Sequence, residues 1–169
     1  MVREVNDIWR REGVEVRWPH FTAEGEPADF TLRVLVVKRE TPSNPTGHQW
    51  AVGELLFDQS DNPVAVASAA AAERVLASAG QDHEPTALRH HRLGVILGRV
   101  VAHEIGHFLL NTSGHARRGL MRARIDDRDF ADLRSGAFFL DPTAGQWIRD
   151  AVRRDAGPRR RLARFVYAP

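Results

Sequence analysis

The sequence predicts an α+β fold in which a small, mixed, twisted sheet packs on one long helix, followed by a mainly helical C-terminal part. Strand-like runs fill much of residues 1–85, an unbroken helical pattern covers 86–110, and helical spacing with capping residues returns over 111–156. The 169 residues suit one domain that ends in an Arg-rich tail at 157–169, and a hydrophobic content of 43% is enough for a core.

The sheet-rich part is predicted to begin with a helix. Apolar residues at helical spacing cover 2–12, and Gly13 provides a stop. Alternating or β-branched runs then predict four strands, at 14–18, 31–38, about 50–57 and 64–68. The turn-rich segment 58–63 would join the last two strands as a hairpin, and the Ala-rich run after them continues as a helix or a strand-to-helix transition.

The helix expected from about Thr86 to Leu110 has apolar residues over more than half of its circumference, so we expect it to be buried in the domain centre. Small residues recur every fourth position on the remaining side and would let another backbone approach closely, although some of the glycines can be incidental. These residues are Gly94, Gly98, Ala102 and Gly106.

Two shorter helices are predicted downstream. The acidic residues Asp126, Asp127 and Asp129 open the first of them, since acidic side chains favour the first turn of a helix. The pair Asp141-Pro142 provides an N-cap and a first helical residue for the second.

Composition narrows the classes of function. The absence of cysteine excludes disulfides, thiolate catalysis and Cys-type zinc sites, so any metal must be held by His, Asp or Glu. The net charge of +2 is too small to indicate a general polyanion binder. We expect no membrane-spanning segment and no signal peptide in the chain as written, while a trimmed N-terminus would leave secretion open.

The run HEIGH at 103–107 is the strongest functional signal. With about 3.6 residues per turn, His103 and His107 lie roughly 40° apart around the helix and about 6 Å along it, so both imidazoles can reach one tetrahedral ion. Glu104 then lies beside the metal, where it can act as a general base. A catalytic zinc needs a third protein ligand, and His115 is the leading candidate because NTSG at 111–114 can end the helix and turn the chain back.

The stretch HEIGHFLLNTSGH followed by ARRGLM resembles the metzincin zinc peptidases of the matrixin and archaemetzincin type, whose pattern is HExxHxxGxxH followed by a methionine-bearing turn. The resemblance covers mainly residues 91–122. It implies a zincin-like fold with His103, His107 and His115 as ligands of one zinc ion. It also implies Glu104 as the general base and Met121 beneath the metal. Leu110 stands where the family has its helix-ending glycine, and the third histidine comes two residues late.

Carboxylates offer another third ligand, since HExxH-type sites draw on both kinds of residue. Asp126 or Asp129 of the downstream helix would then bind the ion. The remaining histidines are expected on loops or the surface, or too far back along the helix, and a three-His site also accepts cobalt, manganese or iron.

The sequence therefore predicts a zinc-dependent peptidase acting on a peptide or protein substrate, with Glu104 accepting a proton from a metal-activated water. The only tyrosine, Tyr167, is near the C-terminus, so we do not expect a tyrosine to stabilise the oxyanion. Arg117, Arg118 or Arg122 could serve instead. One alternative is a binding module in which zinc only stabilises the fold. Another, weaker alternative is nucleic-acid binding through the arginines of the C-terminal region, which are Arg153, Arg154, Arg159, Arg160, Arg161 and Arg164.

Overall fold

The fold of this chain is available as a computed structural model, and it describes residues 1–18, 31–39, 52–57, 63–155 and 166–168. The elements in chain order are α1 (Val2–Arg10), β1 (Arg33–Val37), β2 (Gly53–Phe57), β3 (Pro63–Ser68), α2 (Ala69–Ser78), α3 (Thr86–Leu110), α4 (Asp127–Ala131), α5 (Pro142–Asp155) and β4 (Val166–Ala168).

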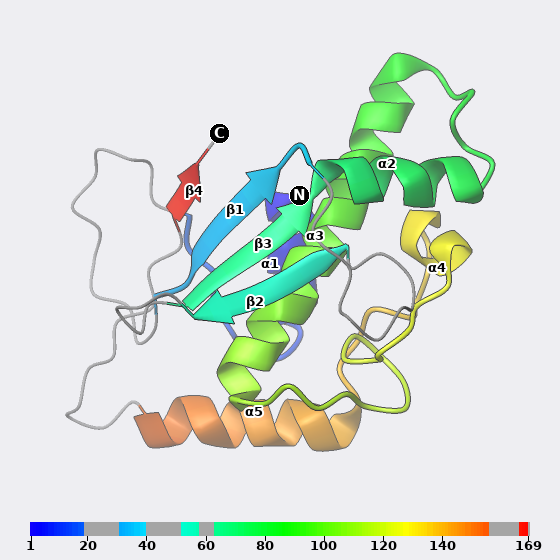
Figure 1. Cartoon of the computed structure of the whole chain (residues 1–169). Coiled ribbons are helices and arrows are strands. Elements are labelled where there is room, and N and C mark those ends of the chain that lie inside the picture. The colour runs from blue at the N-terminus through cyan, green and yellow to red at the C-terminus, as the bar shows by residue number, and fades with distance from the viewer. Residues whose placement is uncertain (19–30, 40–51, 58–62, 156–165, 169) are drawn as a thin grey trace.

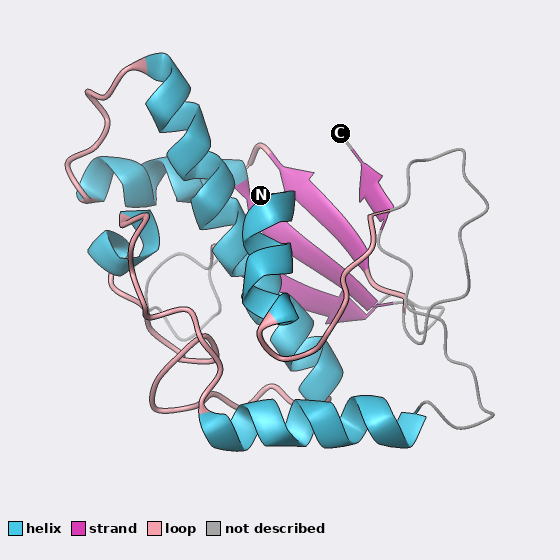
Figure 2. Ribbon diagram, turned by 180° about the vertical axis from the view of Figure 1, so that it is seen from behind, coloured by secondary structure: helices cyan, strands magenta, loops and turns pink. Residues whose placement is uncertain are grey.

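The strands form one mixed sheet with the order β2-β3-β1-β4. Strand β1 pairs in parallel with both β3 and β4, whereas β2 runs antiparallel to β3 and lies at an edge. Helices α1 and α3 lie together on one face of this sheet, and α5 crosses near the C-terminal end of α3 (Figures 1 and 2). The result is a layered α+β domain, as predicted, with α3 between the sheet and α1.

Helix α3 is the centre of the core, as its apolar pattern predicts. Val100, Val101 and Ile105 are at most 3% exposed and share one cluster with Trp9 of α1 and Val34 of β1. Burying large aliphatic and aromatic side chains is the main source of folding free energy, so the position of α3 is set by packing on both sides.

The small-residue ridge of α3 brings neighbouring segments close to the helix axis. A Cβ on Gly98 would lie 2.7 Å from Cβ of Glu4 and 2.8 Å from the Met1 carbonyl oxygen, and one on Gly106 would collide with the sulfur of Met121. A Cβ on Gly94 would meet the Met1 nitrogen at 3.1 Å. The predicted close approach is therefore confirmed: α1 packs on Gly94 and Gly98, and the segment around Met121 packs on Gly106.

A buried arginine joins three parts of the fold. Arg99 of α3 is 2% exposed, pairs with Glu4 at 2.9 Å and lies over the ring of Phe138, with its guanidinium carbon 4.3 Å from the ring centre. Its NH1 group also donates to three carbonyls at the C-terminal end of α4, those of Asp129, Phe130 and Asp132. A buried guanidinium is tolerated only when paired and hydrogen-bonded, so Arg99 fixes α4 and α1 on α3.

One predicted strand is wrong. Residues 14–18 contain no strand, because the segment lies against α1, with Val14 N–H donating to the Trp9 carbonyl and Trp18 Nε1 donating to Asn6 Oδ1 at 2.8 Å. In the Arg-rich tail, where no strand was predicted, Val166–Ala168 pairs with β1. The predicted turn at 58–63 falls almost wholly outside the described residues, although β2 and β3 do pair as antiparallel neighbours.

The expectation about membrane-spanning segments needs a correction for α3. By length and mean hydropathy alone this helix is long and apolar enough to cross a bilayer. Its most apolar window is 61% buried inside the protein, and the core helix of a soluble domain meets the same criterion, so the feature is weak evidence for a membrane span.

Gly98→Val tests the contact between α1 and α3. The added atoms have no room against Glu4 and Met1, so we expect the free energy of unfolding to fall by about 2–3 kcal/mol in urea denaturation, in the range typical of overpacked cores. Gly136→Ala is the control, since a Cβ there meets nothing within 4 Å and should change stability by less than about 0.5 kcal/mol. Equal stability of both variants would contradict this packing.

Candidate metal centre

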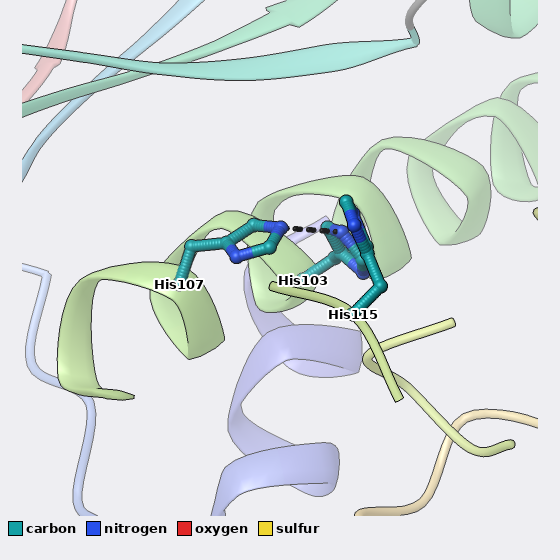
Figure 3. A group of neighbouring side chains, drawn as sticks. All are labelled: His103, His107 and His115. Carbon is teal, nitrogen blue, oxygen red and sulfur yellow. Dashed lines mark hydrogen bonds between the residues drawn. The ribbon is translucent and has the colours of Figure 1, made fainter. Parts of the chain in front are cut away.

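Three histidines converge at the C-terminal end of α3. His103 and His107 project from successive turns of the helix, and His115 returns from the loop that follows it (Figure 3). One ring nitrogen from each lies within 4.8 Å of the others, and the Nε2 atoms of His103 and His107 are 2.9 Å apart. The structure thus brings together the three residues that the sequence singled out.

The end of α3 explains how His115 reaches the pair. Asn111 follows the helix in the left-handed conformation, with φ 48° and ψ 49°, and its N–H donates to the Phe108 carbonyl while Thr112 N–H donates to the His107 carbonyl. This is the pattern of a Schellman motif, which usually has glycine at the left-handed position and sometimes asparagine. The left-handed residue that ends α3 is therefore Asn111, one residue after Leu110, the position at which the metzincin pattern has glycine.

The same turn orients one of the histidines. His107 Nδ1 lies 2.8 Å from the Thr112 carbonyl oxygen, and because that oxygen can only accept, Nδ1 must carry the proton. His107 and Thr112 are therefore joined twice, by this bond and by the bond between Thr112 N–H and the His107 carbonyl. The helix end and the ring orientation depend on each other.

A second backbone carbonyl orients His103. Its Nδ1 lies 2.7 Å from the Leu120 carbonyl oxygen, and Leu120 N–H donates to the Phe139 carbonyl at 2.6 Å. Gly119 precedes Leu120 with φ +77°, and a Cβ there would collide with the Phe139 carbonyl oxygen. Only glycine fits this close approach to Phe139, so Gly119 allows the Leu120 carbonyl to reach the His103 ring.

These two hydrogen bonds fix the chemistry at the other side of both rings. With each Nδ1 protonated, the Nε2 atoms of the neutral rings carry lone pairs that face one another across 2.9 Å. Burial lowers the pKa of His103 to about 4 and also lowers the pKa of His107, so both rings are neutral near pH 7. Such facing lone pairs repel unless a cation lies among them. Two ligands of tetrahedral zinc lie about 3.3 Å apart, so the donor set fits a zinc ion.

His115 completes the group from the solvent side. It is exposed, and its ring centre is 5.4 Å from that of His103 and 4.8 Å from that of His107. Three imidazoles, two of them with the second ring nitrogen hydrogen-bonded to a backbone carbonyl, are a donor set that suits zinc and other borderline metals.

Glu104 projects from α3 toward the edge strand β2. Its side chain is 6% exposed, and a Cβ on Gly53 of β2 would lie 3.0 Å from Glu104 Oε1. Burial, and to a lesser degree the charge of Glu54, raises the pKa of Glu104 to about 8. A buried carboxyl group with a raised pKa, next in sequence to a histidine that could hold a metal ion, is a candidate general base.

Met121 is buried beneath the turn of α3 that carries the two histidines. It is 2% exposed and packs on Gly106, and its carbonyl accepts from Ala116 N–H at 2.7 Å. The bond between Met121 and Ala116 closes the loop that follows His115, so Met121 supports the loop and the helix together.

The carboxylate alternatives are engaged elsewhere. Asp126 caps α4 by accepting from Arg128 N–H, and Asp129 pairs with Arg122 at 3.2 Å. Neither belongs to the histidine group in the part of the chain that the structure describes. Of the arginines proposed for the oxyanion, Arg122 is thus paired with Asp129, Arg118 lies 3.6 Å from Asp141, and Arg117 is exposed.

The other histidines lie away from the centre or outside the described residues. His83 is exposed and lies 3.6 Å from Asp82, His90 and His91 are near the start of α3, and His20 and His48 fall outside the described residues. Sequence reasoning missed the carbonyls of Leu120 and Thr112, because main-chain acceptors leave no residue-type signal. It also missed Gly53, although a glycine inside a predicted strand hints at a close approach.

Gly119→Ala tests the support of His103. We expect the zinc affinity to fall about 10- to 100-fold, because the strained backbone moves the Leu120 carbonyl away from Nδ1. Competitive titration against a zinc chelator measures the change, with Gly136→Ala as the unstrained control. Unchanged affinity in Gly119→Ala would show that the carbonyl contributes nothing to metal binding.

Glu104→Gln tests the burial of the carboxyl group in metal-free protein. Since the folded pKa is raised to about 8 from a model value of 4.5, the wild type should lose stability as pH rises from about 4.5 to 8, where only the unfolded state releases the proton. The Gln variant should escape this loss and be a few kcal/mol more stable at pH 8. Denaturation curves across this range measure it, and exposed Glu73→Gln should follow the wild type. Parallel curves for wild type and Glu104→Gln would contradict the raised pKa.

Comparisons of the chain with protein-family models, with curated protein sequences and with solved structures return no match. The α+β class is observed in the structure, while membership of the metzincins stays a prediction from the motif. What the site does must accordingly be argued from its own geometry.

Proposed function

We propose that this protein is a zinc-dependent peptidase of the metzincin type. The observation that carries the proposal is the convergence of His103, His107 and His115, together with the buried carboxyl group of Glu104, the residue that follows His103 in the helix. Ligands alone would suit a structural zinc, but a buried carboxyl group next to them supplies the base that hydrolysis requires.

One zinc ion per chain would be held by the three imidazoles. When bound, zinc acts as a Lewis acid that polarises a peptide carbonyl and lowers the pKa of water. Among the described residues no fourth His, Asp or Glu joins the group, which leaves a coordination position for water or substrate. The hydrogen bonds to Leu120 and Thr112 keep both helical rings in the ligand tautomer.

Glu104 both accepts and donates the proton. Burial raises the pKa of the carboxyl group, whereas a neighbouring cation would favour the ionised form that accepts a proton. After accepting the proton from water, Glu104 can donate it to the leaving amine, so one residue acts first as base and then as acid.

The edge strand β2, which pairs only with β3 among the described strands, offers a place for an extended substrate. Strand β2 is at the edge of the sheet, and its first residue, Gly53, approaches Glu104. A peptide that pairs with an edge strand gains main-chain hydrogen bonds, and here it would bring its backbone past the base. The second role considered for this protein, nucleic-acid binding through the C-terminal arginines, depends on side chains outside the described residues and stays a weaker prediction.

Metal content and cleavage test this proposal together. We expect about one zinc per chain in the wild type, zinc affinity reduced by at least about 10-fold in His115→Ala, and peptide cleavage reduced by about 10²-fold or more in Glu104→Gln with zinc retained. Elemental analysis and cleavage of an unstructured protein substrate provide the measurements.

His83→Ala is the matched control, since this exposed histidine contacts only Asp82 among the interactions described. It should retain both zinc and activity. A folded wild type that binds no zinc would contradict the proposal, and zinc binding with no cleavage of any peptide would favour a structural site.

A further inference from the structure

The edge strand β2 presents different side chains on its two faces. Gly53 and Leu55 pair with Ala67 and Ala65 of β3, which belong to the core cluster that packs on α3. Because side chains alternate along a strand, Glu54 and Leu56 project from the opposite face. Both of these are exposed, Leu56 by 43%.

Glu54 lies near the catalytic base. It follows Gly53, whose position is in contact with Glu104, and its charge contributes to the raised pKa of Glu104. Among the described residues no arginine, lysine or histidine pairs with Glu54. Glu54 is therefore an exposed carboxylate with no cationic partner among these residues. It directly follows Gly53, the residue of β2 that approaches Glu104.

We infer that β2 selects extended peptides with a lysine or arginine opposite Glu54 and an apolar residue two positions away, opposite Leu56. The inference rests on the proposed function in one respect: the cleaved bond is taken to lie opposite Gly53, where the substrate passes Glu104. The residue between the two selected side chains faces α3, because it pairs opposite Leu55.

The physical basis is cross-strand pairing. Directly opposed side chains on neighbouring strands have Cβ atoms about 4.5–5.5 Å apart, so opposite charges attract and like charges repel. Such pairs contribute about 0.2–1 kcal/mol each, which corresponds to a preference of up to about 5-fold for a basic over a neutral residue. An acidic residue at the same position meets the like charge of Glu54 and should be disfavoured further. An apolar side chain beside Leu56 covers part of its exposed surface.

The test uses the full chain and three peptides that differ only in the residue expected opposite Glu54, which is Lys, Gln or Glu. Cleavage by the wild type gives kcat/KM for each peptide, and fluorescence anisotropy gives the affinity of the zinc-loaded Glu104→Gln variant. We expect Lys to exceed Glu by about 10-fold in both measurements. Glu54→Arg should reverse the order, and Glu73→Arg, an exposed glutamate of α2, should leave it unchanged.

The outcomes separate the two proposals. Cleavage or binding that is equal for the three peptides, or an order that persists in Glu54→Arg, would overturn the inference while leaving a peptidase in place. Selective binding without cleavage would support the inference and contradict the proposed function. Absence of both binding and cleavage would overturn both. A dimer formed through the β2 edges, seen as a concentration-dependent mass, would also overturn it, because the edge would then be occupied.

Discussion

The candidate site depends on one constraint, the two hydrogen bonds that fix the Nδ1 protons of His103 and His107. These bonds run to the carbonyls of Leu120 and Thr112, and they leave two lone pairs facing each other across 2.9 Å. In a protein without a cation this arrangement costs free energy, since His107 is buried, His103 is partly buried and both rings are neutral. A metal ion turns the same arrangement into a pre-organised binding site, which is why the geometry favours a metal centre over a packed group of core histidines.

The scaffold supplies the rigidity that such a site requires. Helix α3 packs against the sheet on one side, and on the other side α1 packs on its glycines. Arg99 of α3 donates hydrogen bonds to the end of α4. Met121 packs on Gly106 beneath the site, and the Schellman motif at Asn111 ends the helix where His115 can return. These supports come from distant parts of the sequence, so a substitution far from the histidines can still alter their positions.

Local features of the sequence predicted a good part of this structure. The limits of α3, the acidic start of α4 and the pair Asp141-Pro142 that opens α5 follow from local sequence preferences, and the spacing of His103 and His107 follows from the helical repeat. Long-range partners were not predictable: residues 14–18 alternate like a strand but pack on α1, and the short strand β4 gains its structure only by pairing with β1. The carbonyls that orient the histidines escaped prediction for the same reason.

The most direct test of the account is X-ray absorption spectroscopy at the zinc edge of the protein loaded with one zinc ion. We expect three imidazole nitrogens and one water oxygen at about 2.0–2.1 Å from the metal, and one fewer imidazole in His115→Ala. A fourth ligand from the protein, or the same number of imidazoles in wild type and variant, would contradict the claim that His103, His107 and His115 form an open, catalytic centre.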